Sequence, residues 1–510
     1  MNDNLFESFR MRFPQDPRAV VMEIPGCRQY RYADLDRDSA MFALRLSDAG
    51  ANPGDRVMVQ VEKSLEAVAV YLACLRAGFV FIPLNTAYGR EELEYLTADA
   101  SPAAVVCDPA SHLAAADFPY SAPCGTFTLD CDGLGSLTKG AREVAKDLET
   151  VPCRGEDVAA ILYTSGTTGR AKGAMLTHAN LASNAVALCD CWGLSDSDVL
   201  LHALPIFHTH GLFVAINTTL LQGGQMLFLP RFDVEQVLSV LPRVTVMMGV
   251  PTYYTRLLND ARFDKWACRS IRLFISGSAP LLPETFEEFR RRTGHAILER
   301  YGMTETNMIA SNPVDGDRTA GSVGYPLPGV AVRICGEDGT ALADGQIGNI
   351  EVRGPSVFKG YWRNPEKTNA EFCEDGFFKT GDVGRFDSNG YLHIVGRSKD
   401  LIISGGFNVY PKEVEEVVDR IDGVGESAVI GVSHPDFGEG VVAVVVPDRT
   451  RAGELTVGEV IAEARSRLAA FKTPKAVVFV EELPKNAMGK IEKAKLRSAY
   501  NDLFSTVGGQ

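Results

Sequence analysis

The stretch of this 510-residue chain best suited to chemistry is YTSGTTGRAKG, residues 163–173. It holds three glycines, five hydroxyl side chains and two cations, Arg170 and Lys172. Backbone N–H groups of glycines, hydroxyl donors and cations together can bind phosphate oxygens. The GxxxxGK[ST] pattern of a Walker A loop is absent, so this is a different phosphate-binding loop. A mobile Gly/Thr surface loop is the alternative, but such loops rarely concentrate hydroxyl groups and cations so closely.

An apolar run and a helix-favouring segment flank this loop. Residues 158–162 are apolar and predict a buried strand. Residues 174–188 favour a helix, so the expected order is strand, glycine-rich loop and helix. This order suits phosphate binding, because the free N–H groups at a helix N-terminus attract anions. We therefore expect the loop to hold the phosphates of a nucleoside triphosphate.

The strand–loop pattern continues along the chain. In an open α/β sheet, ligands bind beyond the carboxyl ends of the strands, so polar loops that follow strands meet around one site. We expect the glycine-rich loop to share its site with three later segments. Each is a predicted strand followed by a loop of small or polar residues: 199–204 before 205–211, 273–276 before 277–280, and 297–300 before 301–305.

The wider pattern predicts an α/β protein with two domains. Helical and strand patterns alternate through residues 1–150, which indicates a parallel sheet with helices on both faces. From residue 321 onward, short strands alternate with Gly-Asp, Asp-Gly and Asn-Gly turns. The predicted architecture is a large N-terminal domain of stacked α/β sheets over residues 1–397, with a β-rich subdomain at about 321–397, and a small α+β domain over residues 398–510.

The composition is ordinary for a globular protein and argues against a nucleic-acid partner. Hydrophobic residues make up 45% of the chain and charged residues 23%, with a net charge of −14. That charge disfavours nucleic acid and anionic membranes as main partners. No apolar run reaches the roughly 18–20 residues of a membrane span, and the N-terminal segment is too charged for a signal peptide. The eleven cysteines show no zinc-finger spacing, so we expect free thiols in a cytoplasmic protein.

Six motifs in order make the chain similar to a known superfamily. From about residue 30 to 495 it resembles the acyl-adenylate-forming enzymes, which include acyl-CoA synthetases, non-ribosomal peptide adenylation domains and luciferases. One such motif could be chance, but six in the family's order could not. They are YTSGTTGRAKG (163–173), ALPIFHTHG (203–211), SGSAPL (276–281), ERYGMTE (299–305), FKTGDVG (378–384) with GRSKDLIISGGFNVYP (396–411), and PKNAMGKI (484–491).

Within this superfamily the chain most resembles the malonate–CoA ligases, also called malonyl-CoA synthetases. The similarity lies in local strings such as ILYTSGTTGR, HALPIFHTHGLFVA, GVPTYYTRLL, RLFISGSAPLL and LERYGMTETN. The resemblance implies two steps at one site. A carboxylate first attacks the α-phosphorus of ATP, giving an acyl-adenylate and pyrophosphate. The thiol of CoA then attacks the acyl carbon, and AMP leaves.

The resemblance also implies a nucleotide site. Tyr301 would stack on adenine, and Asp382 would bind both ribose hydroxyls unless it is an ordinary turn aspartate. Arg397 would help to hold the ribose and phosphate. Glu305 would ligate Mg²⁺, a cation that prefers carboxylate, phosphate and water oxygens. The remaining residues implied at the ATP site are Thr164, Ser165, Gly166, Thr167, Thr168, Gly169 and Lys172 at the β- and γ-phosphates, Ser276, Gly277, Ser278 and Ala279 beside adenine, the catalytic Thr304 in the loop that faces the α-phosphate, and Glu299, Arg300, Gly302 and Met303 in the same segment.

Lys490 is the residue that we expect to catalyse adenylation and to contact ATP. It follows a glycine, and a flexible point charge there could stabilise the charge that develops between the carboxylate and the α-phosphate. A solvated surface lysine is the alternative. By resemblance, Lys399 is the hinge of a mobile C-terminal domain. Rotation about it would bring Gly405 and Gly406 beside the pantetheine of CoA.

A dicarboxylic substrate needs a cation in the acyl pocket, because a second charge cannot be buried unpaired. Arg300 precedes the adenine-stacking tyrosine at a position that faces the acyl pocket in the family, and arginine can bind a carboxylate through two parallel hydrogen bonds. An ion pair with Glu299 or another acid is the alternative. His208 and Ser276 would line the same pocket, although His208 could be a structural histidine. Arg231 and Arg256 are weaker candidates.

Other functions fit the same motifs. The chain could be a CoA ligase for methylmalonate or another short-chain acid, or it could load a carrier-protein thiol. A non-catalytic nucleotide-binding protein fits less well, since Glu305, Asp382 and Lys490 are all present. No pattern in the sequence specifies an oligomeric state.

Overall fold

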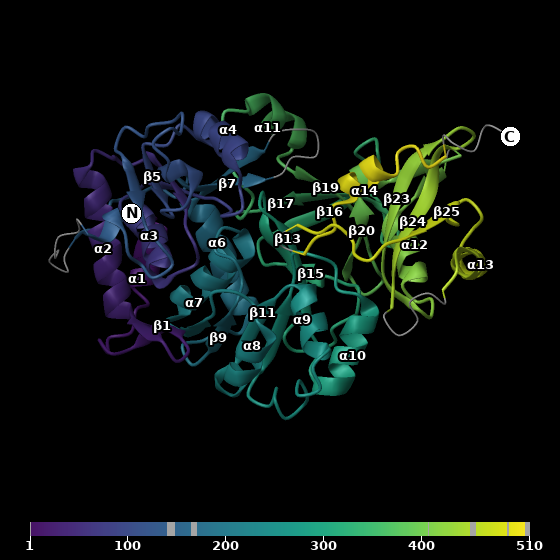
Figure 1. Ribbon diagram of the computed structural model, residues 1–510, viewed down its shortest axis with the longest axis horizontal. Helices are drawn as coiled ribbons and strands as arrows, with labels where there is room; N and C mark the ends of the chain where they lie inside the picture. Colours follow the sequence, from purple (N-terminus) through teal and green to yellow (C-terminus); the bar gives the residue numbers. More distant parts are fainter. Residues whose placement is uncertain are drawn as a thin grey trace.

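The computed structural model describes residues 2–139, 148–164, 171–405, 407–448, 455–486 and 489–504. Four β-sheets organise the chain, and Figure 1 shows the last of them, β22-β21-β24-β23 with β25, set beside a larger body that holds the other three. This arrangement confirms the predicted α/β fold with a large N-terminal domain and a smaller C-terminal one.

The first sheet has seven strands in the order β18-β8-β7-β4-β3-β5-β6. The strands from β7 to β6 run parallel, whereas β8 and β18 pair antiparallel at one edge. Its strands are β3 (Arg56–Gln60), β4 (Val80–Pro83), β5 (Ala104–Cys107), β6 (Thr126–Thr128), β7 (Val158–Thr164), β8 (Lys172–Thr177) and β18 (Gly360–Tyr361).

The second sheet has nine strands in the order β15-β14-β13-β12-β11-β9-β10-β1-β2. Neighbours from β13 to β1 run parallel, so the carboxyl ends of β9, β11, β12 and β13 lie at one edge. Its strands are β1 (Val20–Ile24), β2 (Arg28–Arg31), β9 (Val199–His202), β10 (Gln225–Phe228), β11 (Val246–Gly249), β12 (Leu273–Ser276), β13 (Leu298–Met303), β14 (Asn307–Ser311) and β15 (Tyr325–Pro326).

A layer of buried helices lies between these two sheets. All twelve residues of α3 are buried, as expected for a helix with a sheet on either side. Side chains alternate along the strands, so each sheet gives one face to this shared core and the other to outer helices. The inner helices include α1 (Leu5–Arg10), α2 (Tyr32–Asp48), α3 (Leu65–Arg76), α6 (His178–Trp192), the π-helix η2 (His210–Ile216) and α7 (Asn217–Gln222), and the outer ones α4 (Arg90–Ala100), α8 (Val234–Val240), α9 (Pro251–Leu258) and α10 (Pro283–Thr293).

The β-rich region predicted from residue 321 forms a four-stranded antiparallel sheet, β16-β17-β19-β20. The predicted turn at 387–390 joins β19 to β20, and Gly390 adopts φ +81° there. This sheet comprises β16 (Ala331–Cys335), β17 (Gly348–Arg353), β19 (Phe378–Phe386) and β20 (Leu392–Arg397), and short helical segments elsewhere are η1 (His112–Ala114), α5 (Ser136–Lys139), η3 (Leu241–Arg243) and α11 (Pro365–Glu371).

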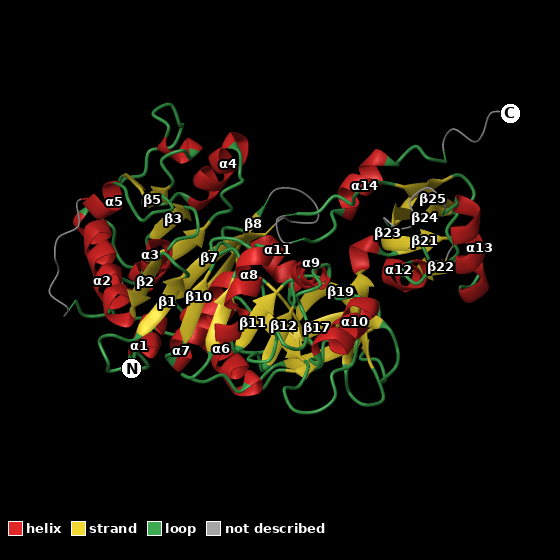
Figure 2. Cartoon of the chain, turned by 60° about the horizontal axis from the view of Figure 1, so that its bottom comes forward, coloured by secondary structure: helices red, strands yellow, loops and turns green. Residues whose placement is uncertain are grey.

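The C-terminal sheet builds its own core. Apolar side chains from its two faces pack against helices of the same region, and Figure 2 shows these helices around the sheet. The sequence did not reveal β25 or α14. The elements are η4 (Ser398–Asp400), β21 (Ile402–Ser404), β22 (Phe407–Val409), α12 (Pro411–Val418), β23 (Val424–His434), β24 (Gly438–Pro447), α13 (Val457–Arg467), β25 (Ala476–Phe479) and α14 (Lys493–Ala499).

The expected order of strand, glycine-rich loop and helix is wrong. Residues 172–177 form β8, which pairs antiparallel with β7, and α6 begins only at His178. Thr177, the last residue of β8, caps α6 through its side chain. The segment predicted to bind phosphate therefore joins β7 to β8, and α6 begins after β8. Likewise, the loop expected at 301–305 is strand as far as Met303, because it pairs with β14.

No helix in the described part of the chain is long and apolar enough to cross a membrane.

Candidate active site

The loops that follow β9, β12 and β13 lie together at one edge of the nine-stranded sheet. His210 Nδ1, beyond β9, lies 3.2 Å from Ser278 Oγ, beyond β12. Gly277 lies against the guanidinium of Arg300, so closely that an added Cβ would be 2.3 Å from Arg300 Cζ. The end of β7 joins them, since Thr164 Oγ1 lies 3.4 Å from Glu305 Oε1. Parallel strand order places these residues together.

Asp382 connects the nine-stranded sheet to the β-rich sheet. Its side chain is 3% exposed, and each oxygen has a donor. Tyr301 Oη donates to Oδ2 at 2.5 Å, and Arg397 Nε lies 2.8 Å from Oδ1. Asp382 and Arg397 are also directly opposite each other in the pairing of β19 with β20. Burial and the nearby Asp382 carboxylate raise the pKa of Tyr301, so this phenol stays a hydrogen-bond donor.

Glu305 is a buried carboxylate whose partners are hydroxyl groups. Thr164 and Tyr361 Oη (3.1 Å) donate to it, and burial raises its pKa. Tyr361 Oη also lies 2.7 Å from Glu371 Oε2, so its single proton is shared between the two carboxylates, and its ring lies under the Lys172 ammonium at 5.4 Å. The described residues contain no cluster of three or more potential metal-ligating side chains. One carboxylate beside a phosphate loop nevertheless fits Mg²⁺, which keeps several waters and takes its other ligands from phosphate.

The structure describes only the two ends of the glycine-rich loop, residues 163–164 and 171–173. Thr164 ends β7 and Lys172 begins β8, directly opposite each other in the ladder. The predicted phosphate-binding residues Ser165, Gly166, Thr167, Thr168 and Gly169 lie outside the described residues. Their role stays a prediction.

Arg300 is 4% exposed, and its Nε and Nη2 atoms have no hydrogen-bond partner in the described part of the chain. Burial lowers the pKa of its guanidinium to about 9. The alternative ion pair with Glu299 does not form in the structure. Glu299 precedes Arg300 on a strand, so its side chain points to the opposite face. There Glu299 accepts from the Leu281 N–H at 3.4 Å, and burial raises its pKa to about 7.

Two histidines lie beside Arg300. His208 Nδ1 accepts the backbone N–H of His210 at 3.4 Å, so the neutral His208 ring carries its proton on Nε2. Burial, together with the charges of Arg300 and Lys490, lowers the pKa of His208 to about 4. His210 was not predicted as a site residue. The repeated histidine of the HTHG string was the one available signal.

The other predicted residues differ in burial, backbone conformation and contacts. Ser276 ends β12 with a buried Oγ that has no hydrogen-bond partner in the described residues. Ser278 adopts φ +72°, a conformation unfavourable for residues other than glycine. Thr304 follows β13 directly. The predicted roles of Ala279, Gly302 and Met303 are not tested by any contact here. Arg231 and Arg256 are exposed, and Arg256 packs over the ring of Phe232 at 4.9 Å.

Lys490 reaches the N-terminal domain from the C-terminal one. Its loop is a tight turn closed by the bond from Lys490 N to Asn486 Oδ1 at 3.0 Å. Gly489 adopts φ +73°, and an added Cβ would lie 3.2 Å from Thr252 Oγ1 on α9. The Lys490 side chain is partly exposed, yet burial and the charge of Arg397 lower its pKa to about 8. The charge of Lys490 also contributes to the lowered pKa of His208.

The predicted hinge lies where the β-rich sheet meets the C-terminal domain. Lys399 is in η4, the short segment between β20 and β21. Asp400 in the same segment pairs with Arg497 at 3.0 Å. Gly405 lies at the turn between β21 and β22 with φ +60°, and Gly406 lies outside the described residues. The hinge and CoA-binding roles of these residues stay predictions.

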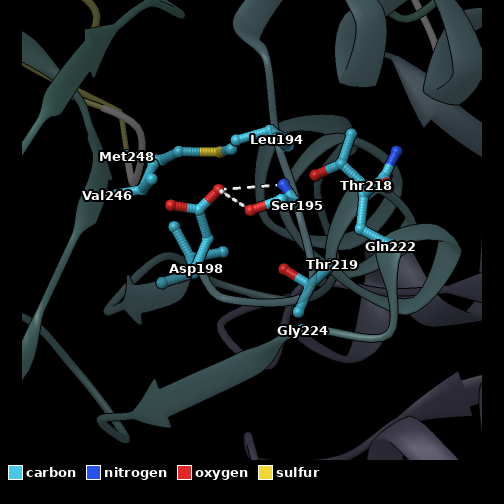
Figure 3. A pocket seen from close by; sticks show the side chains of 10 residues that line it. Leu194, Ser195, Asp198, Thr218, Thr219, Gln222, Gly224, Val246 and Met248 are labelled. Atoms are coloured by element: carbon cyan, nitrogen blue, oxygen red, sulfur yellow. Dashed lines mark hydrogen bonds between the residues drawn. The ribbon is translucent and has the colours of Figure 1, made fainter. Parts of the chain in front are cut away.

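A small cavity elsewhere in the fold is not a candidate active site. It lies between the end of α6, α7 and the strands β9 and β11, with room for about one water molecule (about 20 Å³). Figure 3 shows Asp198 bonded to Ser195 at its edge. Asp198 is also paired with Arg272 at 2.6 Å, so its charge is already compensated.

Comparison with known proteins identifies the class to which this fold and site belong. Residues 6–362 match the AMP-binding enzyme family, and residues 413–490 match the AMP-binding enzyme C-terminal domain. The chain therefore belongs to the AMP-binding enzymes, and within them to the AMP-forming acyl-CoA ligases.

Individual relatives show which acyl-CoA ligases this chain is similar to. The fold matches ATP-bound MatB from Rhodopseudomonas palustris with a TM-score of 0.96 and 53% identity over 99% of this chain and 100% of that one. The apo structure of the same protein matches with a TM-score of 0.85. A feruloyl-CoA synthase from Amycolatopsis sp is 37% identical (96% of this chain, 97% of that protein), and a malonate–CoA ligase from Arabidopsis thaliana is 35% identical (89% and 79%).

Removal of the Lys490 ammonium tests its catalytic position. Lys490→Ala should slow acyl-adenylate formation by about 100-fold or more, because the charge that develops at the α-phosphate loses its nearest mobile cation. ATP–pyrophosphate exchange measures this step. Thioester formation from supplied acyl-AMP should change much less, and Lys495→Ala, which removes an exposed lysine of the same domain, should change neither. Equal losses in both steps would contradict the assignment.

The lowered pKa of Lys490 predicts a falling limb in the pH profile. The ammonium is charged below its pKa and becomes neutral as the pH rises through about 8. In exchange assays, kcat/KM for the free enzyme should therefore fall above about pH 8. In Lys490→Arg, whose guanidinium stays charged, the residual activity should lack this limb. An unchanged limb in that variant would assign the ionisation to another group.

Proposed function

We propose that this enzyme ligates malonate to coenzyme A through malonyl-AMP, releasing pyrophosphate and AMP. The observation that carries the proposal is the buried Arg300 guanidinium with no acidic partner in the described residues. An unpaired buried charge is costly, so a site that retains one is built for a ligand of opposite charge.

The open atoms of Arg300 suit a carboxylate. Nε and Nη2 point in the same direction from the planar guanidinium, and together they donate two parallel hydrogen bonds to the two oxygens of one carboxylate. Ser276 Oγ and Thr209 Oγ1 are also buried without partners. A monocarboxylic acid would leave these donors unsatisfied after its single carboxylate reached ATP. Malonate supplies a second carboxylate, separated from the reacting one by a single methylene group.

The remaining residues support adenylation next to this pocket. Lys172, Thr164 and the loop between them would hold the β- and γ-phosphates, while Asp382 would exchange a present hydrogen bond for the ribose hydroxyls. A bound Mg²⁺ on Glu305 would neutralise phosphate charge. Lys490 would stabilise the charge that develops as the malonate carboxylate attacks. The higher similarity to ATP-bound than to apo MatB, together with the contact of Gly489 with Thr252, supports an adenylation arrangement of the two domains.

Thioester formation would use a second arrangement. We propose a boundary between residues 397 and 398, with Lys399 as the hinge about which the C-terminal domain rotates. Gly405 and Gly406 would then border the pantetheine of CoA. The separate cores of the two domains support such a rotation, since most of the C-terminal apolar surface is already buried within that domain. All eleven cysteines lie in the described residues as free thiols, which supports a cytoplasmic, reducing setting.

A substrate panel tests the proposal. Formation of AMP and acyl-CoA would be followed with ATP, Mg²⁺ and CoA, using malonate, methylmalonate, succinate, acetate, butyrate and ferulate. We expect malonate to have the highest kcat/KM. A preference for ferulate or a fatty acid would leave the acyl-CoA ligase chemistry in place and reject the dicarboxylate pocket. Activity that requires a carrier protein in place of CoA would reject the proposed acceptor.

Two substitutions test Arg300 itself. Arg300→Gln should raise the malonate KM by about 10- to 100-fold, because hydrogen bonds to a charged group are worth about 1.5–3 kcal/mol. Gly277→Ala should have a similar effect, since its methyl group would displace the flexible guanidinium. Gly458→Ala, at a glycine of α13 with no atom near the added methyl group, is the control. Unchanged malonate kinetics in Arg300→Gln would remove Arg300 from the pocket.

A further inference from the structure

His210 is a second buried group beside Arg300 with an open position. It begins the π-helix η2 and is 1% exposed. Its Nδ1 lies 3.2 Å from Ser278 Oγ, whereas its Nε2 has no hydrogen-bond partner in the described part of the chain. Buried polar atoms without partners are rare in proteins, and one that lies beside an equally open arginine points to a shared ligand.

Contacts of Gly211 with His202 and Pro205 fix the backbone that carries His210. Lys63 Nζ donates to His202 Nδ1 at 2.8 Å, so His202 carries its proton on Nε2 and donates it to the Gly211 carbonyl at 2.8 Å. Gly211 lies against Pro205, where an added Cβ would be 2.1 Å from the carbonyl oxygen. These contacts fix the turn on which His210 sits, so its ring position is set before substrate arrives.

The hydrogen-bond partners determine which nitrogen of His210 carries the proton. Burial and the charge of Arg300 hold the pKa of His210 well below its usual range, so the ring is neutral and has one N–H. Arg300 can only donate hydrogen bonds, and an Nε2 lone pair beside it would accept one, yet neither group bonds to the other. Ser278 Oγ can donate to Nδ1. When Ser278 Oγ donates to Nδ1 in this way, the ring proton lies on Nε2, which has no hydrogen-bond partner in the described residues.

Ser278 adopts a strained conformation at this contact. Its φ of +72° lies in the left-handed region, which costs a non-glycine residue roughly 1–2 kcal/mol. Strain of this kind persists where the surrounding structure requires it, often at functional sites. Here the conformation places the hydroxyl against the His210 ring.

We propose that His210 is a substrate-binding residue that donates a hydrogen bond from Nε2 to the distal carboxylate of the acid, alongside the two donors of Arg300. This inference rests on the proposed malonate specificity. Three donors on one carboxylate explain why two basic groups are buried together without an acid. His208, whose Nε2 proton is also available and which lies nearer Lys490, is left for the reacting end of the substrate.

A pair of substitutions separates this role from a structural one. Glutamine is long enough to place its amide nitrogen near the Nε2 position of histidine, whereas the amide of asparagine reaches only the Nδ1 position. His210→Asn should raise the malonate KM by about 10- to 100-fold. His210→Gln should recover most of this loss. The KM for ATP and the melting temperature should change little in both variants, and His112→Asn, at an exposed histidine, serves as the control.

An analogue with an uncharged distal group adds a second measurement. Malonamate, the monoamide of malonate, keeps one carboxylate and replaces the distal one with an amide. The preference of the unmodified enzyme for malonate over malonamate should shrink about tenfold or more in His210→Asn. Equal malonate KM values in the asparagine and glutamine variants, or an undiminished preference, would overturn the inference. If the unmodified enzyme prefers a monocarboxylate, the proposed function itself fails.

Discussion

The site depends on one positive charge that the fold buries and leaves uncompensated. Arg300 lies on β13, the third strand from one edge of the nine-stranded sheet, and is 4% exposed. Burial of a charge is normally offset by a nearby acid, but the adjacent Glu299 points to the other face of the strand. The surrounding elements are arranged around this charge. Gly277 leaves room for the guanidinium, and the turn after β9 brings two histidines beside it.

A second constraint links the nucleotide side to the position of the C-terminal domain. Asp382 binds Tyr301 from one sheet and Arg397 from another, so the proposed ribose site depends on a place where three β-strands meet. Arg397 is the last residue of β20, directly before the segment that leads into the C-terminal domain. If the C-terminal domain rotates as proposed, its movement would be coupled to the residues proposed to hold the nucleotide.

Local patterns predicted much of the fold. The strands at 246–249 and 273–276 and the helices at 32–48 and 234–240 follow from apolar periodicity, which depends on neighbours a few residues apart. Residues 174–177 were predicted as the start of a helix, and residues 172 and 173 as the end of the glycine-rich loop. They form β8 because β7 offers an antiparallel edge, a partner that local propensity does not register.

The sequence by itself determined the class of enzyme and the residue types of its site, because the glycine-rich and charged motifs are short local stretches that can be identified in order along the chain. It determined that Arg300, Glu305, Asp382 and Lys490 were candidates. Only the tertiary structure decided that, among the described residues, Arg300 has no acid beside it, Asp382 is shared by two donors, and His210 Nε2 has no partner. These properties arise from burial and from contacts between segments far apart in the chain. The local sequence does not predict which polar atom lacks a hydrogen-bond partner after the sheets have packed.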